Sequence, residues 1–445
     1  MTTTITLLGH TWVLASVSVA VLSITFMAVL IVFRVPIGIA MILAGLIGGA
    51  GIVGWPAALG FLSTEAMTKL SSPDTAVAPM FLLMGQLATV SGLSGDLYRL
   101  GYACVGHVRG GLAMATIAGC GFFGAICGSA AATTATFTRV ALPEMLNRNY
   151  SRPLACGVIS AGGCLGTLMP PSVPLVLYAI MAEQFILELF LAAFIPAFLF
   201  IFLLFATIWL RCLINPDAGP PGQRQSAKEV LAAFKQGFAG IFLLVTVLGG
   251  IYGGVFTVNE GAAVGCILAL IFALARGAMT FETTIFTIRH SVVAIGMIYI
   301  ILIGAGVFNY LVALTQVSSV LIQAVADAGW TNWMVLLFLI STYVLLGTVF
   351  DEVAAMLITL PLVIPLILDM GYSLVWWGIV NMVIINLGQT TPPIGLNLFV
   401  VHGLTGEKFS VLYRGILPFN GAMLVLLAIL MIWPDIALFL PRALM

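Results

Sequence analysis

The chain has 445 residues, of which 62% are hydrophobic and only 7% are charged, and its formal net charge is zero. Soluble domains carry about 25% charged residues, so this composition excludes a soluble globular protein and predicts a polytopic membrane protein surrounded by the lipid bilayer. The zero net charge and the lack of a long basic run exclude nucleic acid as an expected partner. The seven scattered cysteines indicate neither a disulfide framework nor a zinc site.

Long apolar runs predict ten membrane spans, since about 20 residues cross the hydrocarbon core. In chain order they cover residues 12–33, 36–54, 77–95, 154–181, 189–210, 238–256, 261–275, 291–314, 375–400 and 417–440. The first is expected to be a true span rather than a signal peptide, because no basic segment precedes it. Two more apolar blocks, 110–138 and 333–366, are not counted among these spans.

The distribution of Lys and Arg indicates how the chain crosses the membrane. If the N-terminus is outside and both blocks enter and leave on one side, 14 of the 16 basic residues lie inside. Only Lys69 and Arg442 then lie outside. The two blocks are therefore predicted to be re-entrant hairpins, one from each side. Their unpaired peptide groups need surrounding protein or a polar cavity.

Two of the predicted spans contain the same interrupting motif. "GTLMPP" begins at Gly166 and "GQTTPP" begins at Gly388. Adjacent prolines end a helix, because each lacks an N–H and clashes with the preceding turn. Each span should therefore consist of two half-helices. The first ends in free carbonyls that can hold a cation, and the second begins with free N–H groups that can hold a carboxylate.

An internal repeat relates the two halves of the chain at an offset of 222 residues. Matching residues are Pro143 and Pro365, Tyr150 and Tyr372, Gly166 and Gly388, Pro170 and Pro392, and Pro171 and Pro393, while Ser129 falls on Asp351. Because the hairpins open to opposite sides, the halves are inverted, as in secondary transporters with sites at the midplane. The predicted fold is an all-α polytopic membrane protein with two inverted repeats, each containing a re-entrant hairpin and a broken helix.

Oxygen atoms at the hairpin tips and breaks are candidate ligands for coupling ions, because hard cations such as sodium prefer oxygen. The first ion is expected among Gly124, Cys127, Gly166, Met169 and Pro170. The second is expected among Gly347, Asp351, Gly388, Thr391 and Ile394. Cys127, Met169, Pro170 and Ile394 would contribute backbone carbonyls. For Asp351 and Glu352 the alternative is a solvated position on the hairpin flank.

Several segments resemble the large membrane subunit of tripartite ATP-independent periplasmic (TRAP) transporters. They are "RVPIGIA" (34–40), "MFLLMGQLATVSGL" (80–93), "GGLAMATIAGCGFFGAICGSAAATTAT" (110–136), "GTLMPPSVPLVLYA" (166–179) and "GQTTPPIGLNLFVV" (388–401). The resemblance covers nearly the whole chain. In the segment "GAICGSA" (124–130), at the tip of the first hairpin, Cys127 and Ala130 stand where many members have hydroxyl residues. This departure favours backbone ligation of the first ion.

The resemblance implies a transport subunit with an elevator-type mechanism and no enzymatic activity. It implies two partners, a separate small four-helix membrane subunit and a periplasmic substrate-binding protein. It also implies that a sodium gradient, without ATP or another cofactor, drives uptake of a carboxylate-bearing solute. The solute is expected at the half-helix N-termini and at polar residues Ser129, Thr133, Ser172, Thr390 and Asn397.

This hypothesis divides the chain into five parts. They are 1–109, the N-terminal spans and an amphipathic connector; 110–181, the first hairpin and broken helix; 182–332, scaffold spans with a cytoplasmic loop at 211–236; 333–401, the second hairpin and broken helix; and 402–445, the C-terminal span. The expected location is the inner (cytoplasmic) membrane of a bacterium or archaeon, with a periplasmic N-terminus.

Three alternatives remain. A stand-alone ion-coupled carboxylate carrier could share the inverted architecture and need no binding protein. A channel would need a continuous pore rather than two opposed hairpins. A membrane-embedded enzyme is disfavoured, because the chain has no H-E-x-x-H motif, no G-x-S-x-G motif and no paired intramembrane aspartates.

Overall fold

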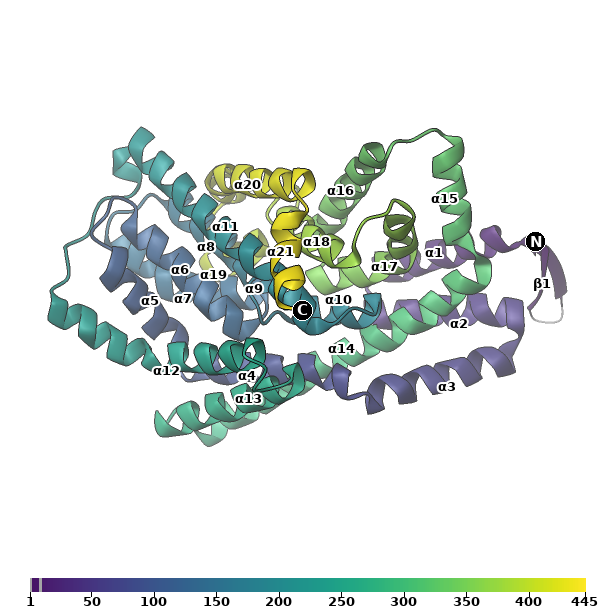
Figure 1. Ribbon diagram of the computed structural model, residues 1–445, viewed down its shortest axis with the longest axis horizontal. Helices are drawn as coiled ribbons and strands as arrows, with labels where there is room; N and C mark the ends of the chain where they lie inside the picture. The colour runs from purple at the N-terminus through teal and green to yellow at the C-terminus, as the bar shows by residue number, and fades with distance from the viewer. Residues whose placement is uncertain (1, 8–9) are drawn as a thin grey trace.

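The computed structural model describes residues 2–7 and 10–445, with side chains described from residue 17 onward. In this part of the chain, twenty-one α-helices follow a pair of short antiparallel strands, β1 (Thr2–Leu7) and β2 (His10–Ala15) (Figure 1). The all-α fold class is confirmed for the membrane-embedded body. The first predicted span was too long, because its residues 12–15 pair with β1 and the helix α1 (Ser16–Val32) begins only afterwards.

One group of helices, called the scaffold below, lies in the first part of each half. It comprises α1, α2 (Ile37–Val53), α3 (Trp55–Ser71), α4 (Val77–Val90), α5 (Leu93–Val105), α12 (Ala227–Tyr252), α13 (Val258–Ala275), α14 (Phe281–Thr315) and α15 (Val317–Asp327). Helices α2, α3 and α14 pack along one another (Figure 1). Helix α3 was not predicted, and the span predicted at 77–95 ends at Val90, where the chain bends by 70° into α5.

The other group, called the core, contains the predicted hairpins and broken helices. It comprises α6 (Gly111–Cys127), α7 (Ala130–Asn147), α8 (Arg152–Gly163), α9 (Leu165–Leu168), α10 (Val173–Ala182), α11 (Ile186–Ile214), α16 (Asn332–Val349), α17 (Glu352–Asp369), α18 (Leu374–Gln389), α19 (Leu396–Thr405), α20 (Phe409–Ile432) and α21 (Asp435–Leu444). Helix α11 was expected among the scaffold spans of 182–332, but it packs against α18, α20 and α21 of the core. In the described part of the chain, seven helices of scaffold and core together are long and apolar enough to cross a membrane. The number rises to nine if each of the two bent helix pairs, α4 with α5 and α8–α9 with α10, counts as one span.

The two apolar blocks each form a pair of helices joined by a short tip, and the two pairs match closely. Helices α7 and α17 have the same bounds after a shift of 222 residues, and so do the first residues of α8 and α18. Ser129 and Asp351 are the matching N-caps, each accepting a hydrogen bond from the backbone N–H three residues later. The first block was predicted too short, because α7 continues to Asn147.

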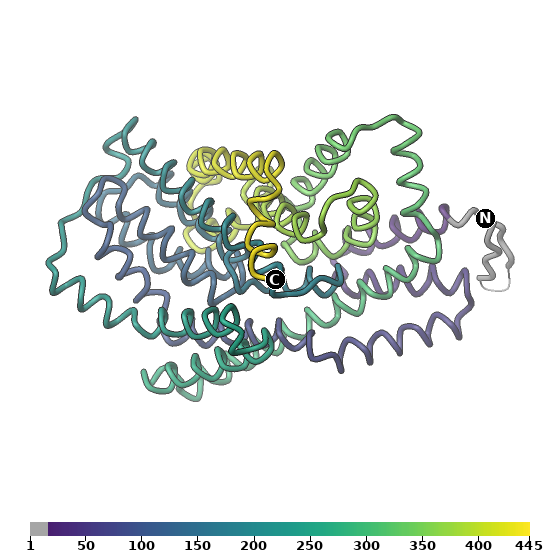
Figure 2. The backbone as a smooth tube through the Cα atoms, viewed as in Figure 1, coloured from purple at the N-terminus to yellow at the C-terminus, as the bar shows by residue number. Residues whose placement is uncertain are grey.

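Both predicted breaks are present in the backbone. The first span bends by 41° between α9 and α10, and in the second span α18 and α19 are separated by residues 390–395 (Figure 2). The Pro170–Pro171 and Pro392–Pro393 peptide bonds are both cis. Proline thus interrupts the same position of each repeat, as the motif predicted.

Helices α8 and α20 cross closely within the core because glycine removes side chains from the contact. A Cβ atom placed on Gly157 of α8 would lie 2.3 Å from the backbone oxygen of Gly415 on α20. Real Cβ atoms essentially never approach a backbone atom so closely, so any larger residue must push the helices apart. The close crossing holds the first broken span against the C-terminal part of the chain.

The substitution Gly157→Leu should lower the unfolding temperature of the detergent-solubilised protein, with a cost of about 1–3 kcal/mol from overpacking. The matched control is Gly421→Leu on α20, where a Cβ meets no atom within 4 Å. Equal unfolding temperatures for the two variants would contradict the close crossing.

Candidate ion and solute site

Each hairpin meets the break of its own repeat through a pair of glycines. A Cβ on Gly124 of α6 would lie 2.7 Å from Cα of Gly166 on α9. In the second repeat, a Cβ on Gly388 would lie 2.8 Å from Cα of Gly347 on α16. These two contacts, called the glycine contacts below, bring hairpin backbone directly against the backbone at the end of the first half-helix.

The two repeats meet each other through residues that occupy equivalent positions. Cys164 and Asn386, which are 222 residues apart, are in contact, with 3.9 Å between the sulfur and the Asn386 carbonyl oxygen. Asn386 Nδ2 donates to Thr167 Oγ1 at 2.8 Å, and all three residues are buried. A contact between two symmetry-related residues lies on the symmetry axis. The pseudo-two-fold axis therefore passes between Cys164 and Asn386, close to both breaks.

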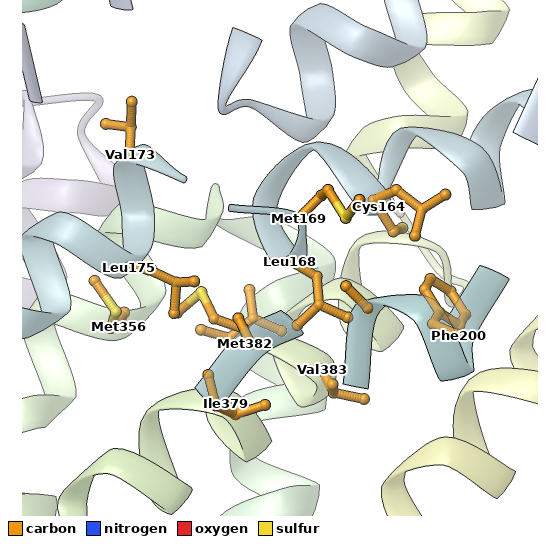
Figure 3. Packing of buried hydrophobic residues seen from close by; sticks show 14 of the residues in the cluster. Cys164, Leu168, Met169, Val173, Leu175, Phe200, Met356, Ile379, Met382 and Val383 are labelled. Carbon is orange, nitrogen blue, oxygen red and sulfur yellow. The ribbon is translucent and has the colours of Figure 1, made fainter. Parts of the chain in front are cut away.

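Apolar side chains fill the space around this polar contact. Figure 3 shows Leu168 and Leu175, on the two sides of the first break, lying near Met356 of α17 and Met382 of α18. All four are 1% exposed or less. Backbone and amide groups at the first break are therefore held in surroundings of low polarity, where their interactions with an ion are strong.

The structure brings the residues of the first predicted ion set together at one hairpin tip and one break. Gly124 and Cys127 lie in the last turn of α6, and Gly166 is in contact with Gly124. Met169 is the C-cap of α9 and Pro170 follows it. Around Gly166 the nearest atoms to a Cβ would be the Ser129 carbonyl and Thr133 Oγ1. That these atoms bind an ion stays a prediction.

The residues of the second predicted ion set also lie together, but two of them are exposed, whereas those of the first set are buried. Gly347 and Gly388 are in contact, and the N–H of Gly395 donates to the Thr348 carbonyl at 3.2 Å, which ties the break to the hairpin. Asp351 is exposed and its carboxylate is engaged as an N-cap, 2.7 Å from the N–H of Ala354. Ile394 is 37% exposed, whereas its counterpart at the first break is buried.

The Thr391 hydroxyl is already used within the protein. It donates to the Leu387 carbonyl at 2.6 Å and accepts from Asn420 Nδ2 at 3.3 Å. The same Asn420 Nδ2 donates to the Thr390 carbonyl at 3.0 Å, and Tyr413 donates to the Pro393 carbonyl at 2.7 Å. Helix α20 thus fixes the backbone of the second break, a role that the sequence did not suggest for Asn420.

The five residues predicted to bind the solute lie at the tips and breaks, but in this conformation their hydrogen bonds are mostly internal. Thr133 donates to the Ser129 carbonyl, Ser172 to the Thr167 carbonyl, and Thr390 to the Asn386 carbonyl. The N-cap Ser129 is half-buried, and the other four are fully buried. Within the described residues, Asn397 keeps a buried side-chain oxygen, Oδ1, without a hydrogen-bond partner.

A further polar pair lies at the same place. From the sequence, Glu352 was considered as an intramembrane acid beside Asp351 but was not included among the ion ligands, and Gln389 was not considered. The Glu352 carboxylate is 6% exposed and accepts a hydrogen bond from Gln389 Nε2. Gln389 is fully buried. Gln389 stands inside the second interrupting motif and Glu352 stands beside Asp351, so their positions in the repeat were the signal that could have identified them.

The fold and this arrangement define an integral membrane protein with two inverted repeats, each pairing a hairpin tip with a broken helix. Residues 24–436 match the family model described as the DctM component of tripartite ATP-independent periplasmic transporters. The chain belongs to this family. It is therefore a large permease subunit and not an enzyme, and such a subunit works with a small membrane subunit and a periplasmic binding protein.

Relatives of this chain include the C4-dicarboxylate TRAP transporter large permease protein DctM of Pseudomonas aeruginosa, 32% identical over 82% of this chain and 85% of that protein. The ectoine/5-hydroxyectoine large permease UehC of Ruegeria pomeroyi is 29% identical over 93% of this chain and 96% of that protein. The isethionate permease DctMQ of Oleidesulfovibrio alaskensis is 29% identical over 93% of this chain but only 65% of that protein.

One solved structure supports the fold independently. The Alcanivorax borkumensis YdaH transporter superposes with a TM-score of 0.59, covering 86% of this chain and 89% of that one. The sequences are 14% identical, so the similarity concerns the fold alone. The chain is thus a multi-pass membrane subunit of a TRAP transporter, which is consistent with the bacterial inner membrane.

The Thr167→Val substitution should destabilise the protein by about 1–3 kcal/mol, because it leaves the buried Asn386 amide without its partner on the axis. The double variant Thr167→Val/Asn386→Leu should recover part of this loss, since both polar groups are then removed. Thermal unfolding of the single and double variants measures the coupling. The control is Thr207→Val on α11, whose hydroxyl bonds only within its own helix. Strict additivity would contradict the contact.

Proposed function

We propose that this chain carries a carboxylate-containing solute into the cell, that sodium binding at the glycine contacts drives the uptake, and that a periplasmic protein delivers the solute. The observation that supports this most directly is the repeated contact of Gly124 with Gly166 and of Gly347 with Gly388. In each repeat it places helix-end carbonyls of a hairpin beside those of a break, where a cation without its water shell finds oxygen ligands.

The second half-helices supply the complementary charge. Helices α10 and α19 begin directly after the breaks, so their first N–H groups form the positive ends of helix dipoles. A solute carboxylate is stabilised at such a position without a Lys or Arg. Relatives named for C4-dicarboxylates and for sialic acid make an anionic solute the natural expectation for this chain.

We further propose an elevator cycle with the N-terminus in the periplasm and a separate small membrane subunit bound to the scaffold. The two breaks differ in solvent exposure, as expected of an alternating-access carrier at one end of its cycle. Pro170 and Pro171 are buried, whereas Pro392 and Pro393 are exposed. Sodium supplies the positive charge that holds the tips against the breaks, and the core then moves relative to the scaffold.

Uptake should be measured in proteoliposomes that contain this chain and its small membrane subunit. We expect radiolabelled C4-dicarboxylate or sialic acid to accumulate only when both the cognate binding protein and an inward sodium gradient are present. A potassium gradient is the control for the ion. Uptake without the binding protein would instead identify a stand-alone carrier, and uptake without sodium would contradict the coupling.

The elevator motion can be tested by joining scaffold and core. A Cβ on Gly101 of α5 would lie 3.5 Å from Cβ of Ala115 on α6, which suits a disulfide. The pair Gly101→Cys/Ala115→Cys, in a background with Cys104→Ser, should lose uptake on oxidation and regain it on reduction. Each single cysteine variant is the control. Undiminished uptake with complete cross-linking would contradict the motion.

A further inference from the structure

A buried carboxylate lies between the two halves, beside the second glycine contact. Glu352 is the first residue of α17 and its exposed fraction is 6%. Its side chain lies beside the backbone N–H of Ala130, the first residue of α7. Glu352 and Ala130 are 222 residues apart and hence equivalent in the two repeats. Glu352 is also hydrogen-bonded to Gln389, which lies one helical turn after Asn386 on α18, so it is close to the pseudo-two-fold axis that the contact of Cys164 with Asn386 marks.

No positive side chain compensates this carboxylate within the described residues. None of the five ion pairs there includes Glu352. The titratable groups that face it are the carboxyl of Asp351 and the thiols of Cys127 and Cys164, none of which carries positive charge. The helices α10, α14, α15, α16 and α18 packed around α17 contribute no ion pair to it. An uncompensated carboxylate is strongly unfavourable inside a membrane protein.

A second, independent observation places an unused ligand at the same point. Gln389 is fully buried, its Nε2 donates to Glu352, and its Oε1 has no hydrogen-bond partner in the part of the chain that the structure describes. The amide therefore holds an unpaired oxygen next to the carboxylate. Carboxylate and amide oxygens are the ligands that hard cations select, and a bound cation would satisfy both groups at once.

We propose that the Glu352 carboxylate and Gln389 Oε1 bind a sodium ion close to the pseudo-two-fold axis, in addition to the ions at the two glycine contacts. This inference rests on the proposed sodium coupling and adds one ion to it. The first repeat has Ala130 and Thr167 at the equivalent positions, so the site occurs once per chain. The sodium ion removes the net charge from the axis and joins the start of α17 to the end of α18.

The test uses the full chain with its small subunit in nanodiscs, and records thermal unfolding in choline chloride and with increasing sodium chloride. The variant is Glu352→Gln, and the matched control is Glu144→Gln on the exposed part of α7. In choline, Glu352→Gln should unfold at a higher temperature than the unmodified protein, because an uncompensated buried charge is gone. With sodium, its stabilisation should be smaller and its Hill coefficient lower by about one.

Gln389→Leu provides a second variant that keeps the carboxylate and removes the amide oxygen. It should unfold at a lower temperature in choline and also need more sodium for half-maximal stabilisation. If both variants respond to sodium as the unmodified protein does, the axial site is wrong while the proposed function stands. A lack of any sodium response in the unmodified protein overturns both. If lowering the pH in choline reproduces the whole sodium effect, the occupant is a proton and the sodium assignment is wrong.

Discussion

The core depends on the direct approach of hairpin backbone to broken-helix backbone at the glycine contacts. Neither contact could form with a side chain present, because a Cβ at Gly124 or Gly388 would lie within 3 Å of the opposing Cα. The consequence is electrostatic as well as steric. Where side-chain charges are costly, peptide dipoles from two chain segments converge instead. The remaining packing of the core keeps these two approaches in place.

The two repeats match more closely in their backbone structure than in the polar side chains that they carry. Helices α7 and α17 share the same bounds after the shift of 222, and Ser129 and Asp351 cap them in the same way. The polar groups differ: the positions of Ala130 and Thr167 are taken by Glu352 and Gln389 in the second repeat. The second break is also the exposed one. The two repeats thus share one backbone architecture but differ in chemistry, and only the second carries carboxylic acids at its hairpin tip, Asp351 and Glu352.

Features set by local chemistry were predictable from the sequence. Adjacent prolines interrupt a helix in any context, so both breaks were found. Helix α3 was missed because Thr64, Glu65 and Lys69 lower its hydropathy. Its place is determined by tertiary contacts, such as the stacking of Phe61 on Tyr310 of α14 with ring centroids 4.0 Å apart. The sequence did group Gly124 with Gly166 and Gly347 with Gly388 at the expected ion sites, but only the folded chain shows that the backbones of each pair touch directly.

The predicted solute residues show why a polar residue in a motif does not imply a free polar group. Ser172 and Thr390 occupy the breaks as expected, yet their hydroxyls donate to carbonyls one turn away that the interrupted helices leave open. The sequence cannot distinguish such internal use from ligand binding. Buried amide oxygens are different, because Asn397 Oδ1 and Gln389 Oε1 have no partner among the residues that the structure describes.

A buried oxygen that lacks a hydrogen-bond partner costs about 1–3 kcal/mol. A ligand that bonds to such oxygens removes this cost, so it stabilises the conformation in which they converge more than any other conformation. Such differential stabilisation is what a bound ion or solute needs in order to shift a conformational equilibrium. Helix α20 makes the effect specific, because Asn420 and Tyr413 hold the backbone of the second break while its amide oxygens stay unsatisfied. The polar groups at the breaks are thus the part of the core that a ligand stabilises, and the apolar side chains around them hold them in position.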